Sequence, residues 1–185
     1  MLDKLRSAFF RRLLRQTLAA QNRQRKTHTL QSAQSVGVLF DATEEKDRTD
    51  VLQFAKRLKE EQKKKVRLLG FVDVKQPLGQ TLFPQITQKE LRWNGKPFGA
   101  ATETFLSEKY DLLLCLNPTQ APVLQWIAAA AMAATKIGTA VADTLHDFDI
   151  VLETPVEKGV PFFMDQLDHY LDKIVPTKHE SKSTS

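Results

Sequence analysis

Two apolar runs, VGVLFD at residues 36–41 and DLLLCL at residues 111–116, decide the fold of this chain. Both lack the alternation of polar and apolar residues that half-exposed strands show. Strands of this kind are buried on both faces, which is typical of parallel sheets. The run VRLLGFVD at residues 66–73 predicts a third strand, and shorter strands are expected at Ile137–Val141 and Ile150–Leu152.

Helical segments alternate with these strands. Val51, Phe54, Ala55 and Leu58 repeat at helical spacing, which predicts a helix over about residues 44–62. Further helices are expected at about 100–108, from Pro122 to about Ala134, and at 160–174. An edge strand is expected at Leu91–Trp93, before the turn at Asn94-Gly95. This alternation indicates a three-layer, Rossmann-like α/β fold with a mostly parallel sheet of about five or six strands.

The N-terminal segment differs from the rest of the chain. Residues 2–20 have arginines around an apolar stripe at helical spacing, which predicts a basic amphipathic helix; the stripe consists of Leu2, Leu5, Phe9 and Leu13. Residues 21–35 are polar and aperiodic, as in a linker. We therefore divide the chain into a helix with its linker (1–34), a Rossmann-like domain (35–175) and a disordered tail (176–185).

Positive charge is concentrated in this N-terminal segment. The whole chain has a formal net charge of +5, whereas residues 1–34 hold eight basic groups and one acid, so the other 151 residues have a net charge of −2. A basic arm on a nearly neutral body indicates a polyanionic partner. The candidate polyanion-binding residues are Lys4, Arg6, Arg11, Arg12, Arg15, Arg23, Arg25 and Lys26.

A second candidate site lies at the carboxyl ends of the strands, where open α/β sheets bind ligands. The sequence places Asp41, Asp73 and Asn117 there. In an enzyme these residues would be acid/base groups or metal ligands, but similar side chains often cap helices or bind loop amides. The first strand–helix loop, DATEEKDRTD at 41–50, has no glycine and has five acids against two bases. It therefore disfavours the phosphate cradle of a P-loop or a dinucleotide-binding loop.

We expect no metal site and no cofactor. The four histidines are scattered without metal-ligand spacing, and no serine-nucleophile motif is present. Cys115 lies in the middle of an apolar run and is predicted to be an inert core residue. A single cysteine also favours a reducing cytoplasm.

Several short motifs resemble those of a bacterial protein family, mostly from Bacteroidota, with a basic N-terminal segment before a Rossmann-like domain of unknown function. They are VGVLFD at 36–41, KPFG at 96–99, YDLLLCLN at 110–117, AATKIG at 133–138 and DIVLE at 149–153. The resemblance covers most of residues 1–174. It implies the fold and a cytoplasmic bacterial setting, and it implies no catalytic residue.

Three functional hypotheses follow from the sequence. The first is a non-enzymatic binding or scaffold protein whose basic arm docks on a polyanion, with ribosomal RNA or a ribosome-associated assembly as the leading candidate; we expect no readout of DNA sequence. The second is a peripheral adaptor at the inner membrane, near a membrane complex, in which the stripe inserts and the arginines meet lipid phosphates. The third is a small-molecule-binding enzyme that uses Asp41, Asp73 and Asn117.

Overall fold

The computed structural model describes residues 2–140 and 144–173, and within them six strands form one sheet in which every neighbouring pair is parallel. The strand order is β3-β2-β1-β4-β5-β6, which is the order of the Rossmann fold. The strands are β1 (Ser35–Asp41), β2 (Lys65–Phe71), β3 (Gln85–Ile86), β4 (Lys109–Leu116), β5 (Met132–Gly138) and β6 (Ile150–Val151). The Rossmann-like α/β fold expected from the sequence is confirmed.

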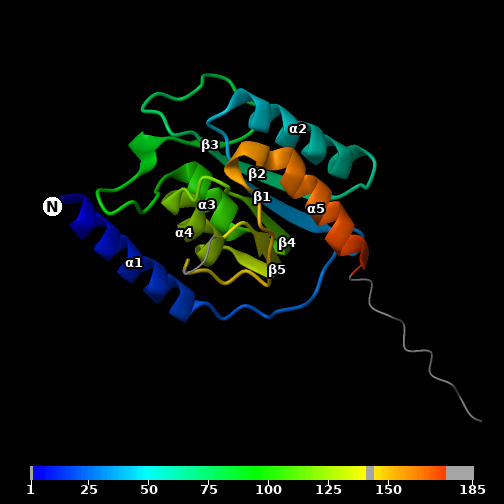
Figure 1. The fold of residues 1–185 in the computed structure, drawn as a ribbon, viewed down its shortest axis with the longest axis horizontal. Helices are drawn as coiled ribbons and strands as arrows, with labels where there is room; N and C mark the ends of the chain where they lie inside the picture. The colour runs from blue at the N-terminus through cyan, green and yellow to red at the C-terminus, as the bar shows by residue number, and fades with distance from the viewer. Residues whose placement is uncertain (1, 141–143, 174–185) are drawn as a thin grey trace, which may run out of the picture.

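Helices cover both faces of the sheet (Figure 1). They are α1 (Leu2–Ala20), α2 (Glu45–Glu60), α3 (Ala100–Ser107), α4 (Pro122–Ala130) and α5 (Gly159–Lys173), with short 3-10 turns at η1 (Gln88–Glu90) and η2 (Val156–Lys158). Helices α2 and α5 pack on one face, and α3 and α4 pack on the other. The central strand β1 alternates between the two cores, since Val38 and Phe40 face α2 and α5 whereas Leu39 faces α3 and α4.

The prediction that one helix runs from Pro122 to about Ala134 is wrong at its end. Helix α4 stops at Ala130, and β5 begins at Met132. Strand β5 pairs with β4 from Met132 to Gly138 and is therefore longer at its start than the predicted strand. The alanines have little preference for a strand, but pairing with the buried β4 overrides that weak preference. The last predicted residue of that strand, Val141, lies outside the described residues.

The predicted edge strand at Leu91–Trp93 is also wrong. Leu91 makes only an isolated antiparallel bridge with Pro97, across the turn at Asn94-Gly95. The edge of the sheet is instead β3, which pairs with Gly70 and Phe71 of β2. Two residues inside a proline- and glycine-rich stretch give too short a pattern for a strand to be predicted.

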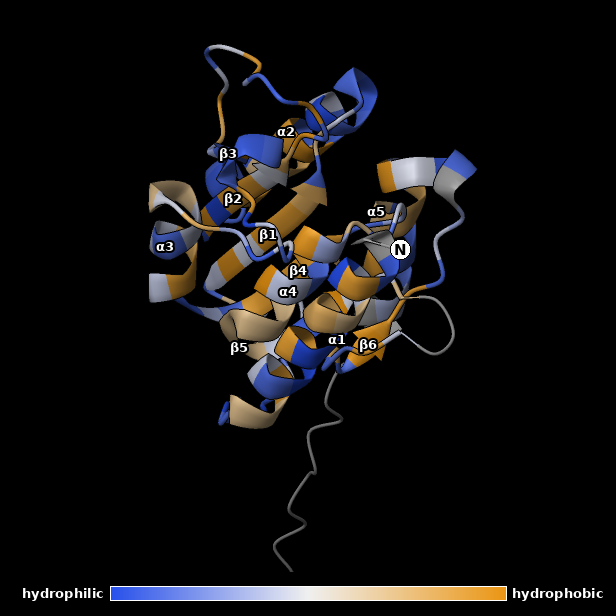
Figure 2. Ribbon diagram, turned by 90° about the vertical axis from the view of Figure 1, so that its left-hand side faces the viewer, coloured by the Kyte–Doolittle hydropathy of each residue, from blue (hydrophilic) through white to orange (hydrophobic). Residues whose placement is uncertain are grey.

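Helix α1 packs on its own domain, outside α4 (Figure 2). Phe10 and Leu14 are buried in the core that α3 and α4 share with the sheet. The indole Nε1 of Trp126, on α4, donates a hydrogen bond to Thr17 Oγ1 at 3.1 Å. The side chain of Gln21 donates another to the carbonyl of Ala129. The amphipathic helix predicted from the sequence therefore exists, and one of its faces is occupied by the domain.

The segment after α1 has no helix or strand up to Ser35, as expected of a linker, but it is hydrogen-bonded along β5. The backbone N–H of Lys26 donates to Ala134 O at 3.1 Å, and that of His28 donates to Thr135 Oγ1 at 2.8 Å. The Thr135 hydroxyl in turn donates to the carbonyl of Lys26. The linker therefore fixes the end of α1 relative to the sheet.

A buried ionic network completes this attachment. Lys136 on β5 has no exposed surface, and its Nζ lies 2.7 Å from Asp147 Oδ2 and donates to the carbonyl of Ala128. Arg23, from the linker, also pairs with Asp147 at 3.3 Å and with Asp149 at 2.9 Å. Burial lowers the pKa of Lys136, although Asp147 acts to raise it. The network thus joins the linker, β5 and the loop before β6.

Truncation of Leu14 tests the docking of α1. Leu14→Ala is expected to lower the free energy of unfolding by about 2–5 kcal/mol, because the buried side chain leaves a cavity. Leu5→Ala, on the exposed face of the same helix, is the matched control and should change it by no more than about 0.5 kcal/mol. Chemical denaturation measures both, and equal effects would contradict docking through Leu14.

Removal of Asp147 tests the ionic network. Asp147→Ala is expected to lower the free energy of unfolding by about 3–5 kcal/mol, because it deprives the fully buried Lys136 of its counter-charge. Glu153→Ala is the control: it removes one negative charge from an exposed residue and leaves Lys136 paired with Asp147. If the two variants are equally stable in urea titrations, the network does not hold the linker.

The lowered pKa of Lys136 also predicts a pH dependence. The folded protein releases this proton at a lower pH than the unfolded chain, in which a lysine has its ordinary pKa of 10.5. Between the two pKa values the unfolded chain binds more protons, so the free energy of unfolding rises with pH. We expect the stability of the native protein relative to Lys136→Met to increase as the pH approaches 10.5 in denaturation curves. A difference that is constant with pH would contradict the shift.

Candidate functional site

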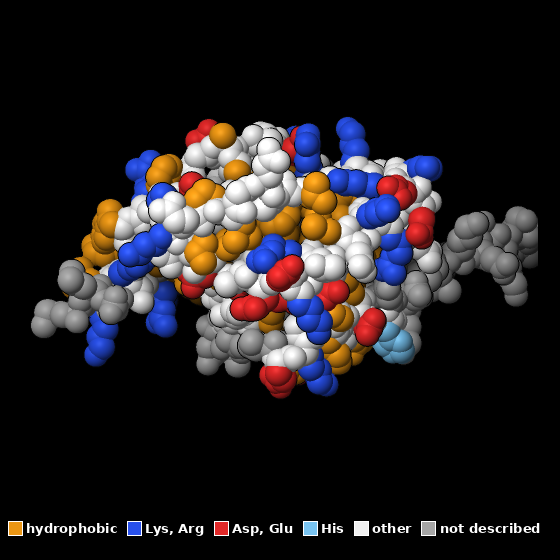
Figure 3. Space-filling model, turned by 90° about the horizontal axis from the view of Figure 1, so that it is seen from above, with side chains coloured by type: hydrophobic (Ala, Val, Ile, Leu, Met, Phe, Trp, Pro, Cys, Tyr) orange, Lys and Arg blue, Asp and Glu red, His pale blue; other side chains and the backbone are white. Residues whose placement is uncertain are grey.

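Helix α1 presents five cations to solvent. Lys4, Arg6, Arg11, Arg12 and Arg15 are all exposed, and none forms an ion pair with a residue that the structure describes. Figure 3 shows Lys and Arg side chains at the end of the molecule where α1 begins and also over the rest of that face. Because packing and the linker fix α1, these charges lie at set positions on the surface.

The three basic residues beyond α1 differ from these five. The side chain of Arg23 is only 4% exposed and points at Asp147 and Asp149 instead of solvent. Arg25 is exposed but lies 3.3 Å from Asp149. Lys26 is exposed, and its backbone is held against β5. Arg23 is therefore part of the ionic network and is not among the cations available to a polyanion.

The predicted apolar stripe is divided between the domain and solvent. Leu13 is half-buried against the domain, whereas Leu5 and Phe9 are 53% and 43% exposed. The side chain of Leu2 lies outside the described residues. Trp93, which is 67% exposed, stands beside Phe9 with ring centroids 5.1 Å apart in an edge-on pair. Leu5, Phe9 and Trp93 form an exposed apolar group, which we call the aromatic flank of α1.

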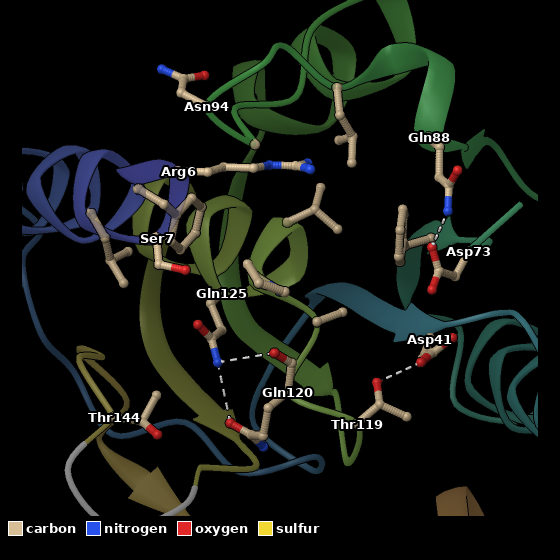
Figure 4. A pocket seen from close by; sticks show the side chains of 18 of the residues that line it. Arg6, Ser7, Asp41, Asp73, Gln88, Asn94, Thr119, Gln120, Gln125 and Thr144 are labelled. Atoms are coloured by element: carbon tan, nitrogen blue, oxygen red, sulfur yellow. Dashed lines mark hydrogen bonds between the residues drawn. The ribbon is translucent and has the colours of Figure 1, made fainter. Parts of the chain in front are cut away.

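Helix α1 also borders a cleft of about 1380 Å³ at the carboxyl ends of the strands, and Trp93 of the aromatic flank lines part of it. The helix contributes Arg6, Ser7, Phe10, Arg11, Leu14 and Arg15 to its lining. Figure 4 shows the Arg6 side chain extending from α1 into this cleft, with Asn94 above it. The basic helix and the strand-end crevice, which are two separate candidate sites in the sequence, thus border the same cavity.

The opposite wall of the cleft is acidic. Asp41 ends β1; its carboxylate accepts hydrogen bonds from the Thr43 amide at 3.0 Å and from Thr119 Oγ1 at 2.6 Å. Asp73, just after β2, accepts one from the side chain of Gln88 at 2.8 Å. Glu44 lines the same wall. Figure 4 shows Asp41 and Asp73 on the side of the cleft away from α1.

Asn117 lies outside this lining. It is 1% exposed, and its Oδ1 accepts from the Ala121 amide at 2.8 Å while its Nδ2 donates to the Ala121 carbonyl. Asn117 therefore shapes the turn into α4. Of the three predicted crevice residues, the structure brings Asp41 and Asp73 to the cleft and places Asn117 behind it.

The cleft offers charged, hydrogen-bonding and apolar groups. No cluster of three His, Cys, Asp or Glu side chains suited to a metal exists among the described residues. Burial raises the pKa of the Cys115 thiol to about 12, so this thiol stays protonated at neutral pH. The polar groups that face the cavity are guanidinium, carboxylate, amide and hydroxyl, and these can hold a polar ligand by charge and hydrogen bonds beside the apolar part of the lining.

Some lining residues were not predicted from the sequence. Arg92, Trp93 and Asn94 reach the cleft from the turn before α3, Gln120 reaches it from the β4–α4 connection, and Gln125 reaches it from α4. The Asn94-Gly95 pair indicates a turn, but no local pattern places that turn beside α1. Gly95, with φ +81°, lets the chain bend directly over the Phe10 ring.

Comparisons with known proteins identify a family. No helix in the described part of the chain is both long enough and apolar enough to cross a membrane. No functionally described protein and no solved structure matches the chain. The model of a family of unknown function, DUF6913, matches residues 6–174. The chain therefore belongs to the DUF6913 family.

Proposed function

We propose that this protein is a non-enzymatic binding protein that docks on RNA through the cations of α1. The observation that supports the proposal is the set of five exposed cations on one helix, without ion-pair partners among the described residues. A phosphate backbone satisfies such charges, and the release of its counterions supplies the binding free energy. Ribosomal RNA, or an assembly on the ribosome, is the leading candidate.

The fixed position of α1 favours this proposal. A flexible arm would lose conformational entropy on binding, whereas a helix already packed through Phe10 and Leu14 loses little. Lys26, beyond the helix, is a further exposed cation. Arg23 and Arg25 face Asp149 and are left out of the proposed surface.

The aromatic flank adds a second kind of contact. Phe9 and Trp93 expose their rings next to the cations of α1, and unpaired RNA bases stack on such rings. Stacking tolerates every base, so this surface suits single-stranded or looped RNA without readout of sequence. We place the protein in a bacterial cytoplasm, as the resemblance to proteins mostly from Bacteroidota suggests.

A membrane surface is the second candidate, and exposed Leu5 favours it. Leucine does not stack on bases, but together with Phe9 and Trp93 it gives an apolar group that could insert at a lipid interface. The neighbouring arginines would then meet anionic headgroups. The protein would be a peripheral adaptor at the inner face of the membrane.

Charge reversal outside the cleft tests the RNA proposal. The affinity of the full-length protein for a labelled single-stranded RNA is measured by fluorescence anisotropy at several salt concentrations. We expect the double variant Lys4→Glu/Arg12→Glu to weaken binding at least about tenfold and to flatten the salt dependence. Lys59→Glu/Lys65→Glu changes the net charge equally on a different surface and is the control. Equal loss in both variants would mean that net charge alone acts.

Vesicle flotation separates the two candidates. If the membrane proposal is right, the protein floats with phosphatidylglycerol vesicles but not with phosphatidylcholine vesicles, and Leu5→Ser abolishes flotation. If the RNA proposal is right, Leu5→Ser leaves RNA affinity unchanged, because Leu5 contributes neither charge nor a ring. Native protein that binds neither RNA nor anionic vesicles at low salt contradicts both.

A further inference from the structure

The cleft lies where a Rossmann-like sheet offers a ligand site. Strand β1 leads into α2 on one face of the sheet, and its neighbour β4 leads into α4 on the other. The connections diverge at this point and leave a crevice between the strand ends. Asp41 and Thr119, from these two connections, bridge the floor of the crevice at 2.6 Å. Its size, about 1380 Å³, is ample for a small-molecule ligand.

The usual place for phosphate in this crevice is closed to an anion. The β1–α2 loop has no glycine, and its Thr43 amide already donates to Asp41. The first helical turn adds Glu45 and Asp47, which repel phosphate from the α2 N-terminus. A phosphorylated ligand must therefore place its phosphate elsewhere in the cleft.

The wall formed by α1 meets that need. Arg6, Arg11 and Arg15 line the cleft from successive turns, and each guanidinium can hold phosphate oxygens through two parallel hydrogen bonds. No described ion pair joins these arginines to the acids on the far wall. Opposite charges thus face each other across an open space, with Arg6 extended into it (Figure 4).

The acidic wall complements a sugar. Asp73 follows β2, the strand whose end carries the ribose-binding acid in dinucleotide-binding folds. Its Oδ1 accepts from Gln88, and no described residue hydrogen-bonds its Oδ2. A carboxylate only accepts hydrogen bonds, so it selects hydroxyl donors and rejects phosphate.

We propose, beyond the docking of α1 on RNA, that the cleft binds a ribose phosphate such as a nucleotide, with its phosphates on Arg6, Arg11 and Arg15 and its ribose hydroxyls on Asp73. The ligand lies in the Rossmann crevice with its phosphates held by the N-terminal helix instead of the first strand–helix loop. A ribose phosphate has the two chemistries that the opposite walls require.

Calorimetric titration of the full-length protein with ATP, ribose 5-phosphate, adenosine and inorganic phosphate tests the proposal. We expect Arg6→Met to lower the affinity for ATP, ribose 5-phosphate and inorganic phosphate at least about tenfold. The affinity for adenosine should not change. Asp73→Asn should lower the affinity for ATP, ribose 5-phosphate and adenosine by about fivefold or more, and it should not lower the affinity for inorganic phosphate. Arg12→Met, on α1 but outside the cleft lining, is the control and should leave the affinities for all four compounds unchanged.

Two results would overturn the proposal. One is that native protein binds neither ATP nor ribose 5-phosphate. The other is that Asp73→Asn raises the affinity for every phosphate compound, because Asp73 would then act only as a repelling charge. The outcome is separable from RNA docking, since Lys4→Glu/Arg12→Glu tests the docking surface and Arg6→Met with Asp73→Asn tests the cleft. Nucleotide binding without RNA binding would leave the cleft proposal intact.

Discussion

The ion pair between Lys136 and Asp147 is the interaction on which both candidate sites depend. A lysine with no exposed surface must be paired, and here Asp147 lies 2.7 Å away while Arg23 approaches the same carboxylate. Arg23 belongs to the linker, so the pairing that satisfies a buried charge also holds the N-terminal segment on β5. Without that attachment α1 would depend on the packing of Phe10 and Leu14 and on hydrogen bonds such as Trp126 to Thr17, and its arginines would be held less firmly beside the cleft.

Attachment gives α1 three surfaces with separate roles. Phe10, Leu14 and Thr17 face the domain, Arg6, Arg11 and Arg15 border the cleft, and Leu5 and Phe9 lie beside Trp93. An amphipathic helix in isolation has one apolar and one polar face. Here the domain covers only part of the apolar face, which leaves an exposed aromatic flank next to exposed cations.

Local patterns predicted the strands that are buried on both faces, because a short apolar run such as VGVLFD, rich in valine and followed by a polar loop, is typical of a parallel strand covered by helices. They failed where a long-range contact decides the outcome. The alanines after α4 become β5 because β4 pairs with them, and Arg23 leaves solvent because two aspartates more than 120 residues later surround it. The cleft lies beyond local prediction for the same reason. Its arginines come from α1 and its acids from the ends of β1 and β2, and the docking of α1 on the domain brings them to one cavity.

The shared helix has a thermodynamic consequence for the two proposed sites. An anion in the cleft would neutralise Arg6, Arg11 and Arg15, which lie on the same helix as Lys4 and Arg12. RNA phosphates on the outer surface would then be attracted by a smaller positive charge, so a ligand in the cleft would lower the affinity of the protein for RNA. Thermodynamic linkage makes the effect reciprocal, so docking on RNA would lower the affinity for the cleft ligand by the same factor. The link needs no conformational change, because Lys4 and Arg12 each lie, along the helix axis, within about a Debye length of at least one cleft arginine.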